Sequence, residues 1–262
     1  MGPDGIRFTR AIVRPPAENF ADGLTRAELG RPSHALALEQ HAAYCRALTA
    51  CGLELLLLAP DARYPDSCFV EDTAVLLPEG AMLTRPGAES RLGEVDAVRA
   101  ALAGVFPALA CITAPGTVDG GDICEAGRVV FIGLSRRTNA EGAAQLAQWL
   151  RGMGYEPRLV SIHGIDTILH LKSGLSWLGD GRLLVIDALA GHPEFADFEC
   201  VAVDPGELYA ANAVRVNDRV LIAAGFARLE ARLRALGYSP IALDMGEFEK
   251  MDGALTCLSL RF

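Results

Sequence analysis

The amino-acid sequence predicts an α/β fold built from a strand–strand–helix–strand unit that repeats about five times, with a period of roughly fifty residues. Three observations support this prediction. Pairs of short apolar runs joined by turn-forming residues recur, helical patterns follow several pairs, and a further apolar run follows each helix. Propellers and solenoids both have periods of this length, so the pattern alone leaves both open. No linker divides the 262 residues, and we expect one catalytic domain over residues 1–262.

Four pairs of short strands are predicted, and turn-forming residues separate the two runs of each pair. Gly, Asn and Asp tolerate the backbone angles that hairpin turns require. Two further strands, Arg10–Val13 and Ala254–Leu260, lack a neighbour in sequence, and pairing them with each other would close a ring. The four pairs are 69–77 with 81–84, 122–125 with 128–133, 175–178 with 183–186, and 213–216 with 220–223.

Helices are predicted from caps and from apolar spacing. Gly52 is a suitable C-terminal stop for the first helix. Ser90 is the expected N-cap of the second, and Thr138 with Glu141 matches a capping box that opens the third. A stripe of apolar residues at helical spacing predicts the fourth. The expected helices cover 33–51, 90–102, 143–150 and 226–236.

Composition narrows the class of protein. The formal charge of −9 disfavours nucleic acid as a partner and is compatible with a small cationic ligand. The first residues lack a signal-peptide pattern, and apolar runs such as Leu55–Pro60 are too short to span a bilayer. The seven cysteines show neither disulfide-framework nor zinc-site spacing. We therefore expect a cytoplasmic enzyme without a metal site or membrane partner.

Cys257 is a candidate nucleophile near the end of the chain. It follows an acidic–glycine turn, Asp252–Gly253, and lies in a run expected to form a short apolar strand. Free cysteine is among the most buried residue types and usually behaves as a small hydrophobic side chain. The immediate surroundings of Cys257 therefore leave two interpretations open, core packing and nucleophilic catalysis.

Acidic residues cluster between Asp66 and Asp72, around an apolar centre. Because acidic residues are depleted in strands, this composition is unusual for an extended segment. Alternation along a strand would place Asp66 and Asp72 on one face and Glu71 on the other. The segment predicts either a cation site or acids on solvated loop ends.

A double glycine and a histidine are the remaining candidates. The run Asp119–Asp122 contains paired glycines, which permit close approach to a ligand, and its two acids could orient a histidine or bind a cation. A plain turn is the alternative. His170 and Lys172 alternate with leucines on an expected strand and would share one face. A structural or solvated histidine is the alternative there.

Six motifs in a defined order carry a resemblance that runs from about Arg10 to Phe262. In this combination the sequence resembles the dimethylarginine dimethylaminohydrolases, guanidine-modifying enzymes of the amidinotransferase (pentein) superfamily. The resemblance implies a five-bladed α/β propeller of ββαβ units with pseudo-fivefold symmetry. The motifs are Phe69-Val70-Glu71-Asp72, Thr84-Arg85-Pro86-Gly87, Asp119-Gly120-Gly121-Asp122, Ser135-Arg136-Arg137-Thr138-Asn139, His170-Leu171-Lys172, and Asp252-Gly253 followed by Cys257.

The resemblance also implies roles for individual residues. Cys257 matches the nucleophile, His170 the general acid and base, and Asp119 the carboxylate that orients the histidine. Asp72 matches the group that holds the guanidinium, and Arg85 and Arg137 match residues that grip the amino-acid end of the substrate. The remaining implied substrate contacts are Leu24 in a covering loop, Asp66, Glu71 and Met251.

The activity that the resemblance implies is hydrolysis of Nω-methylated arginine to citrulline and a methylamine through a covalent cysteine intermediate. No cofactor is expected, the expected partner is a small cationic substrate, and a homodimer is left open. One alternative is an arginine deiminase, although those enzymes generally carry a helical insertion for which this chain is short. Another is a non-enzymatic ribosome anti-association factor on the same fold, which lacks the catalytic set found here.

Overall fold

The computed structural model describes residues 7–262, whose strands form five separate three-stranded sheets. Four of the sheets are each built from consecutive strands. Their strands are β3 (Ala74–Leu77), β4 (Gly80–Leu83) and β5 (Leu109–Cys111); β6 (Ile123–Ala126), β7 (Val129–Leu134) and β8 (Glu156–Ser161); β9 (Leu175–Gly179), β10 (Arg182–Val185) and β11 (Glu199–Ala202); and β12 (Val214–Val216), β13 (Arg219–Ala223) and β14 (Pro240–Leu243).

The fifth sheet joins the two ends of the described chain. Its strands are β15 (Ser259–Arg261), β1 (Arg10–Val13) and β2 (Glu54–Leu57). β15 runs antiparallel to β1, with Ala11 opposite Arg261. The predicted pairing of the first and last strands is therefore confirmed, and the closed ring excludes an open solenoid.

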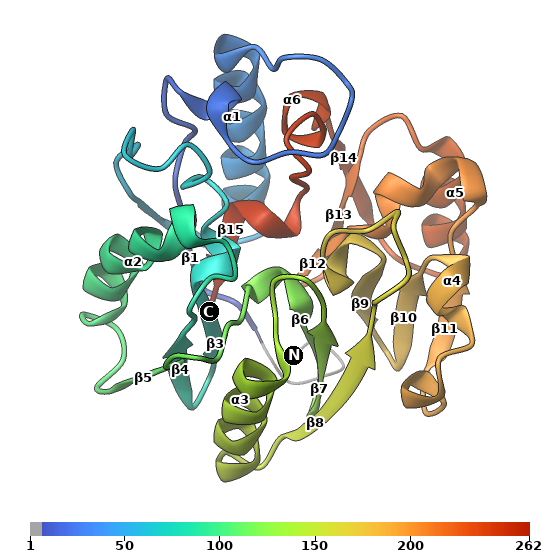
Figure 1. Cartoon of the computed structure of the whole chain (residues 1–262). Helices are drawn as coiled ribbons and strands as arrows, with labels where there is room; N and C mark the ends of the chain where they lie inside the picture. The colour runs from blue at the N-terminus through green and yellow to red at the C-terminus, as the bar shows by residue number, and fades with distance from the viewer. Residues whose placement is uncertain (1–6) are drawn as a thin grey trace.

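Each sheet has the same internal pattern: the first two strands are antiparallel, and the third is parallel to the second. A parallel neighbour requires a crossover, and a helix between the second and third strands supplies it. The five sheets surround a common centre with these helices outside (Figure 1), as the predicted five-bladed α/β propeller requires. The crossover helices are α1 (His34–Ala50), α2 (Val95–Leu102), α3 (Ala140–Gly152), α4 (Asp187–Ala190) and α5 (Ala227–Ala235).

The apolar faces of these helices form the core against the sheets. In α3 the fully buried Ala143, Leu146 and Leu150 pack in one cluster with Val130 and Ile132 of β7. Burial of each such leucine is worth about 1.5–3 kcal/mol. No helix in the described residues is both long enough and apolar enough to cross a membrane.

Two predicted helix starts are wrong. The second helix begins with a 3₁₀ segment, Glu89–Glu94, and Ser90 lies inside that segment instead of capping it. The cap of α3 is Asn139, whose side chain accepts a hydrogen bond from Gly142 N, so Thr138 is not the cap. Two short helices, α4 and α6 (Gly246–Glu249), have no counterpart in the prediction because four residues are too few to show a period.

Candidate active site

A short 3₁₀ helix precedes the first strand of every sheet, and the candidate residues lie in or beside these helices. The five segments are Val70–Thr73, Gly120–Asp122, Leu171–Ser173, Pro205–Ala211 and Thr256–Leu258. The segments expected to be strands at Asp72, His170 and Cys257 are therefore 3₁₀ turns or the residues beside them. Because the sheets repeat around one centre, the repeat brings together residues that are far apart in sequence.

His170 and Asp119 form a buried pair. His170 Nε2 lies 2.9 Å from Asp119 Oδ2, and Asp119 Oδ1 accepts a hydrogen bond of 2.7 Å from Gly87 N. Burial alone disfavours a charged imidazole, but the charge of Asp72 and the hydrogen bond to Asp119 outweigh it and raise the pKa of His170 to about 9. His170 is therefore an imidazolium at neutral pH, and Asp119 holds its Nε2.

Gly121 lets the histidine and Asp72 approach the backbone. A Cβ at this position would lie 2.7 Å from His170 Nδ1 and 3.0 Å from Asp72 Oδ1. The amide of Gly121 donates a hydrogen bond of 2.8 Å to Asp72 Oδ1. The close approach expected of the double glycine is thus present, and its neighbours are the candidate catalytic side chains themselves.

Asp72 is an ionised carboxylate held by a buried arginine. Arg91 Nη1 donates to Asp72 Oδ2 over 2.6 Å, and the same guanidinium is paired with Glu94 at 2.8 Å. Burial raises the pKa of Asp72, but the nearby His170 and Arg91 charges outweigh that effect and lower it to about 2. A carboxylate has about four acceptor positions, so Asp72 retains positions for a cationic ligand.

Cys257 faces these groups as a neutral thiol. It is partly exposed and lines a cavity together with Asp72 and His170. Burial raises the pKa of the thiol to about 12, and the negative charges of Glu71 and Asp72 act in the same direction. The thiol is therefore protonated at neutral pH even with the imidazolium in the same cavity, and a cationic ligand beside the sulfur would favour the thiolate.

Other predicted contacts line the same narrow cavity, whose volume is about 20 Å³. Leu24 N lies 3.1 Å from both carboxylate oxygens of Asp66, which ties the covering loop to the cavity wall. Arg137 contributes Nη1, which is buried without a hydrogen-bond partner. Such an unpaired cation is costly unless a ligand supplies an acceptor. Leu24, Asp66, Arg137 and Met251 thus all line the cavity that contains Cys257.

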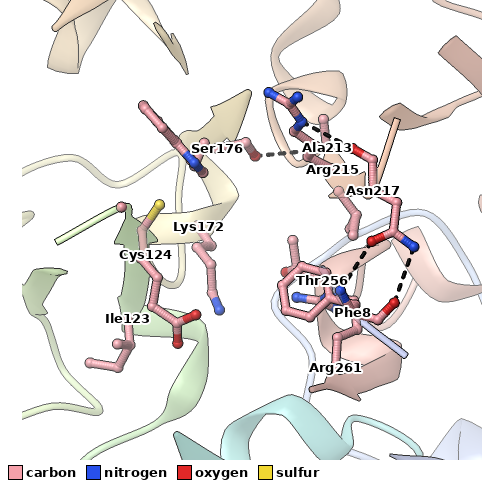
Figure 2. Close-up of a pocket in the computed structure, with 14 residues that line it drawn as sticks. Phe8, Ile123, Cys124, Lys172, Ser176, Ala213, Arg215, Asn217, Thr256 and Arg261 are labelled. Carbon is pink, nitrogen blue, oxygen red and sulfur yellow. Dashed lines mark hydrogen bonds between the residues drawn. The ribbon is translucent and has the colours of Figure 1, made fainter. Parts of the chain in front are cut away.

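Glu71 is a predicted contact that is not among the residues lining the Cys257 cavity. Its carboxylate pairs with Lys172 at 2.7 Å and with Arg261 at 3.7 Å. Lys172 and Arg261 in turn line a separate cavity of about 140 Å³ (Figure 2). The negative charge of Glu71 still reaches the site, because it raises the pKa of Cys257.

Arg85 is a second predicted contact that the lining of the Cys257 cavity does not include. It forms a backbone bridge with Val118. The arginines that line this cavity are Arg137 and Arg91, and Arg91 was not among the predicted contacts. Its one sequence signal is Glu94 three residues later, but this spacing is equally typical of a solvated ion pair.

Asp122 is a positioning residue. The sequence left open whether its carboxylate orients a histidine, binds a cation or lies in a plain turn. Its Oδ1 accepts a hydrogen bond of 2.9 Å from Leu171 N, beside His170, and its Oδ2 accepts one of 2.6 Å from Ser135 Oγ. Ser135 Oγ accepts in turn from Arg137 N over 2.9 Å. One buried carboxylate thus connects the segments that carry His170 and Arg137.

We expect Asp122→Asn to lower kcat/KM by about 10-fold to 100-fold, because the amide cannot accept both hydrogen bonds. The pH dependence of turnover should shift as well, since the imidazole would lose its fixed position. Kinetics over a pH series would check this. A purely structural role would lower the melting temperature and leave the pH profile unchanged.

Asp72, Asp119 and His170 each offer one potential ligand atom, and these three atoms lie within 4.8 Å of one another. This is the geometry of a candidate metal site. The donor set does not fit a metal. His170 is protonated at neutral pH and so has no lone pair free for a metal, and the cation at Asp72 is Arg91. We therefore assign these groups to a polar organic ligand.

No family model matches the sequence. Over 97% of this chain and the whole length of the relative, the chain is 44% identical to N(G),N(G)-dimethylarginine dimethylaminohydrolase of Pseudomonas aeruginosa. The chain belongs to the dimethylarginine dimethylaminohydrolase family. The resemblance drawn from the six motifs is thus confirmed.

Solved structures of dimethylarginine dimethylaminohydrolase agree with this assignment. A cysteine-to-serine variant of the Pseudomonas aeruginosa enzyme in complex with citrulline superposes with a TM-score of 0.95 at 43% identity, covering 98% of this chain and 100% of that chain. A histidine-to-glycine variant of a dimethylarginine dimethylaminohydrolase, present as an adduct with S-methyl-L-thiocitrulline, gives a TM-score of 0.94 at 43% identity, covering 97% and 100%. The predicted fold class is confirmed by these matches and by the five sheets.

Proposed function

We propose that this chain hydrolyses Nω-methylated L-arginine to L-citrulline and dimethylamine or monomethylamine. One observation carries the proposal: the thiol of Cys257, the imidazolium of His170 and the carboxylate of Asp72 line one cavity in a member of the dimethylarginine dimethylaminohydrolase family. The complex of the Pseudomonas aeruginosa enzyme with citrulline supports citrulline as the product.

In the proposed mechanism Asp72 fixes the guanidinium. An arginine-type guanidinium stays protonated at physiological pH and presents a planar set of donors. A carboxylate binds that plane through charge-assisted hydrogen bonds. At about 4 Å and an effective dielectric near 20, one such charge pair is worth roughly 4 kcal/mol before desolvation. Arg137, with its unpartnered Nη1, takes the α-carboxylate at the other end, and Asp66 with the Leu24 loop closes over the amino group.

The chemistry is two displacements at the guanidinium carbon. When the guanidinium binds, the Cys257 thiol loses its proton to solvent, and the thiolate bonds to this carbon. His170 gives its proton to the methylated nitrogen, and the carbon–nitrogen bond breaks to leave a thiouronium on sulfur. His170, now neutral, takes a proton from water as the water attacks the same carbon. The carbon–sulfur bond then breaks, which releases citrulline and restores the thiol and the imidazolium. Asp119 holds the ring for both steps.

We expect the thiol to ionise only when a cationic ligand binds. The pKa of Cys257 is about 12 in the empty site, so the thiol stays protonated at pH 7, and a positive charge beside it lowers that pKa. The absorbance at 240 nm should therefore rise on adding a non-reactive guanidinium or amidinium ligand at neutral pH. Cys257→Ser is the control. A thiolate band in the ligand-free protein at pH 7 would contradict this account.

A comparison of substrates tests the proposed function itself. Asymmetric dimethylarginine, monomethylarginine and arginine would each be incubated with the protein, and citrulline would be measured. We expect turnover of the methylated substrates at rates at least about 10-fold above arginine, because a substrate that fills an apolar contact gains about 1–3 kcal/mol. Turnover of arginine alone would replace the proposal with an arginine deiminase, and turnover of none would favour a binding protein.

We also propose that the chain is a single catalytic domain and that it works in the cytoplasm. All seven cysteines are free thiols, which suits a reducing compartment such as the cytoplasm.

We further propose that the protein forms a homodimer. Strand β2 lies at the edge of its sheet with Leu56 and Leu57 exposed, and an apolar edge strand is a ready site for pairing with a second copy. Sedimentation of the wild type and of Leu57→Lys measures this assembly.

A further inference from the structure

A second cavity adjoins the thiol of Cys257. It has a volume of about 250 Å³, compared with about 20 Å³ for the cavity that holds Asp72. Cys257, Leu169 and Asp252 line both cavities, so the sulfur lies at the boundary between them. The mechanism above uses only the smaller cavity.

The covering loop that contains Leu24 lines both cavities. Leu24 lies over the smaller one, and Arg26, Ala27 and Leu29 lie over the larger. The loop is fixed between them, because Thr25 Oγ1 donates to Lys250 O over 2.9 Å. A substrate held beneath Leu24 therefore leaves the larger cavity as separate space on the other side of Cys257.

The lining of the larger cavity suits a small alkylammonium ion. Apolar walls come from residues such as Ile168, Leu169 and Leu208. The charged side chains are the carboxylates of Glu249 and Asp252 and the guanidinium of Arg26, so the lining keeps a net negative charge. Apolar surface favours methyl groups, and carboxylates favour a positive charge. The methylamine leaves the guanidinium carbon uncharged, takes up a proton from water at neutral pH, and then carries both features.

We propose that this cavity is the leaving-group subsite: it receives the methylated nitrogen and its methyl groups as the amine departs, and it then admits the water that attacks the thiouronium. This inference rests on the proposed function. The covalent intermediate keeps its amino-acid end beneath Leu24, so the amine and the water must exchange by another route. The cavity beside the sulfur supplies that route and makes Leu208 a residue that determines tolerance for N-alkyl groups.

The test changes the size of this cavity and compares leaving groups. Leu208→Trp fills it, and we expect the ratio of kcat for dimethylarginine to kcat for monomethylarginine to fall by at least about 10-fold, since one misfitting methyl group is worth about 1–3 kcal/mol. Leu208→Ala enlarges it and should raise turnover of an Nω,Nω-diethylarginine relative to dimethylarginine. Leu159→Trp, at an exposed position on β8, is the matched control and should leave both ratios unchanged.

The outcomes separate the two proposals. The leaving-group subsite is overturned if Leu208→Trp lowers kcat for dimethylarginine and for monomethylarginine by the same factor. It is also overturned if Leu208→Ala leaves the ratio of diethylarginine to dimethylarginine turnover unchanged. In both cases, wild-type turnover of methylarginine would still uphold the proposed function. Absence of methylarginine turnover in the wild type would overturn both. Because Leu208→Ala only removes atoms from a cavity wall, it keeps the test valid if the tryptophan variant fails to fold.

Discussion

Replacing Cys257 with serine should abolish citrulline formation, with kcat lowered by about 10⁴-fold or more. The reason is the nucleophile itself: a thiol that sits beside a bound guanidinium ionises, whereas a serine hydroxyl in the same place stays protonated. Serine keeps nearly the same size, so Asp72, Arg91 and Arg137 should still bind the substrate. Turnover by citrulline assay and affinity by calorimetry would be measured on the same protein.

Cys111 offers a matched control for this substitution. It is an exposed cysteine on β5, remote from the site, so Cys111→Ser should keep full activity. Citrulline production by Cys257→Ser at the wild-type rate would show that the thiol is not the nucleophile. Loss of both turnover and affinity would indicate a packing role, which is the other interpretation of this cysteine.

Replacing Asp72 with asparagine should have the second-largest effect, a loss of about 100-fold to 1,000-fold in kcat/KM. Removing one partner of a buried charge pair costs about 2–5 kcal/mol. The substitution also removes one source of the raised pKa of His170, so the imidazolium should be lost at a lower pH than in the wild type. Since the protonated histidine is the proposed acid, the high-pH limb of the kcat profile should move from about pH 9 toward neutral pH.

Two measurements separate this effect from unfolding. Asp96→Asn, an exposed acid on α2, is the control for removal of one negative charge and should leave the profile in place. The melting temperature of Asp72→Asn reports the loss of the Arg91 contact. A variant with unchanged KM and an unchanged pH profile would contradict the role assigned to Asp72.

The sequence predicted the repeat because hairpins and crossovers have local signals. Turn residues between short apolar runs and an apolar stripe before Gly237 are each visible within a window of about fifteen residues. Closure of the ring was predicted because Arg10–Val13 and Ala254–Leu260 lacked local partners. The helix starts at Ser90 and Thr138 failed because neighbouring polar residues are equivalent candidates for a cap.

The site was harder to predict because it is assembled from different sheets. Its residues lie in or beside 3₁₀ turns, which show neither the helical nor the strand period, so the expected strands at His170 and Cys257 were wrong. Arg91 was missed for a related reason: burial of its guanidinium by Asp72 depends on a contact across 19 residues. Arg85 and Glu71, which the resemblance implied as substrate contacts, do not line the cavity that Arg91 lines.

Mass spectrometry of the trapped intermediate tests most directly whether Cys257 attacks the guanidinium carbon. His170→Gly, which lacks the proposed acid and base, would be mixed with S-methyl-L-thiocitrulline, whose thiolate leaves without a proton from the enzyme. The protein would then be quenched in acid and digested. The account predicts a thiouronium adduct confined to the peptide that contains Cys257, and none in the double variant with Cys257→Ser. An adduct on another residue would contradict the account. So would citrulline release that continues while Cys257 stays unmodified, or that continues after Cys257→Ser.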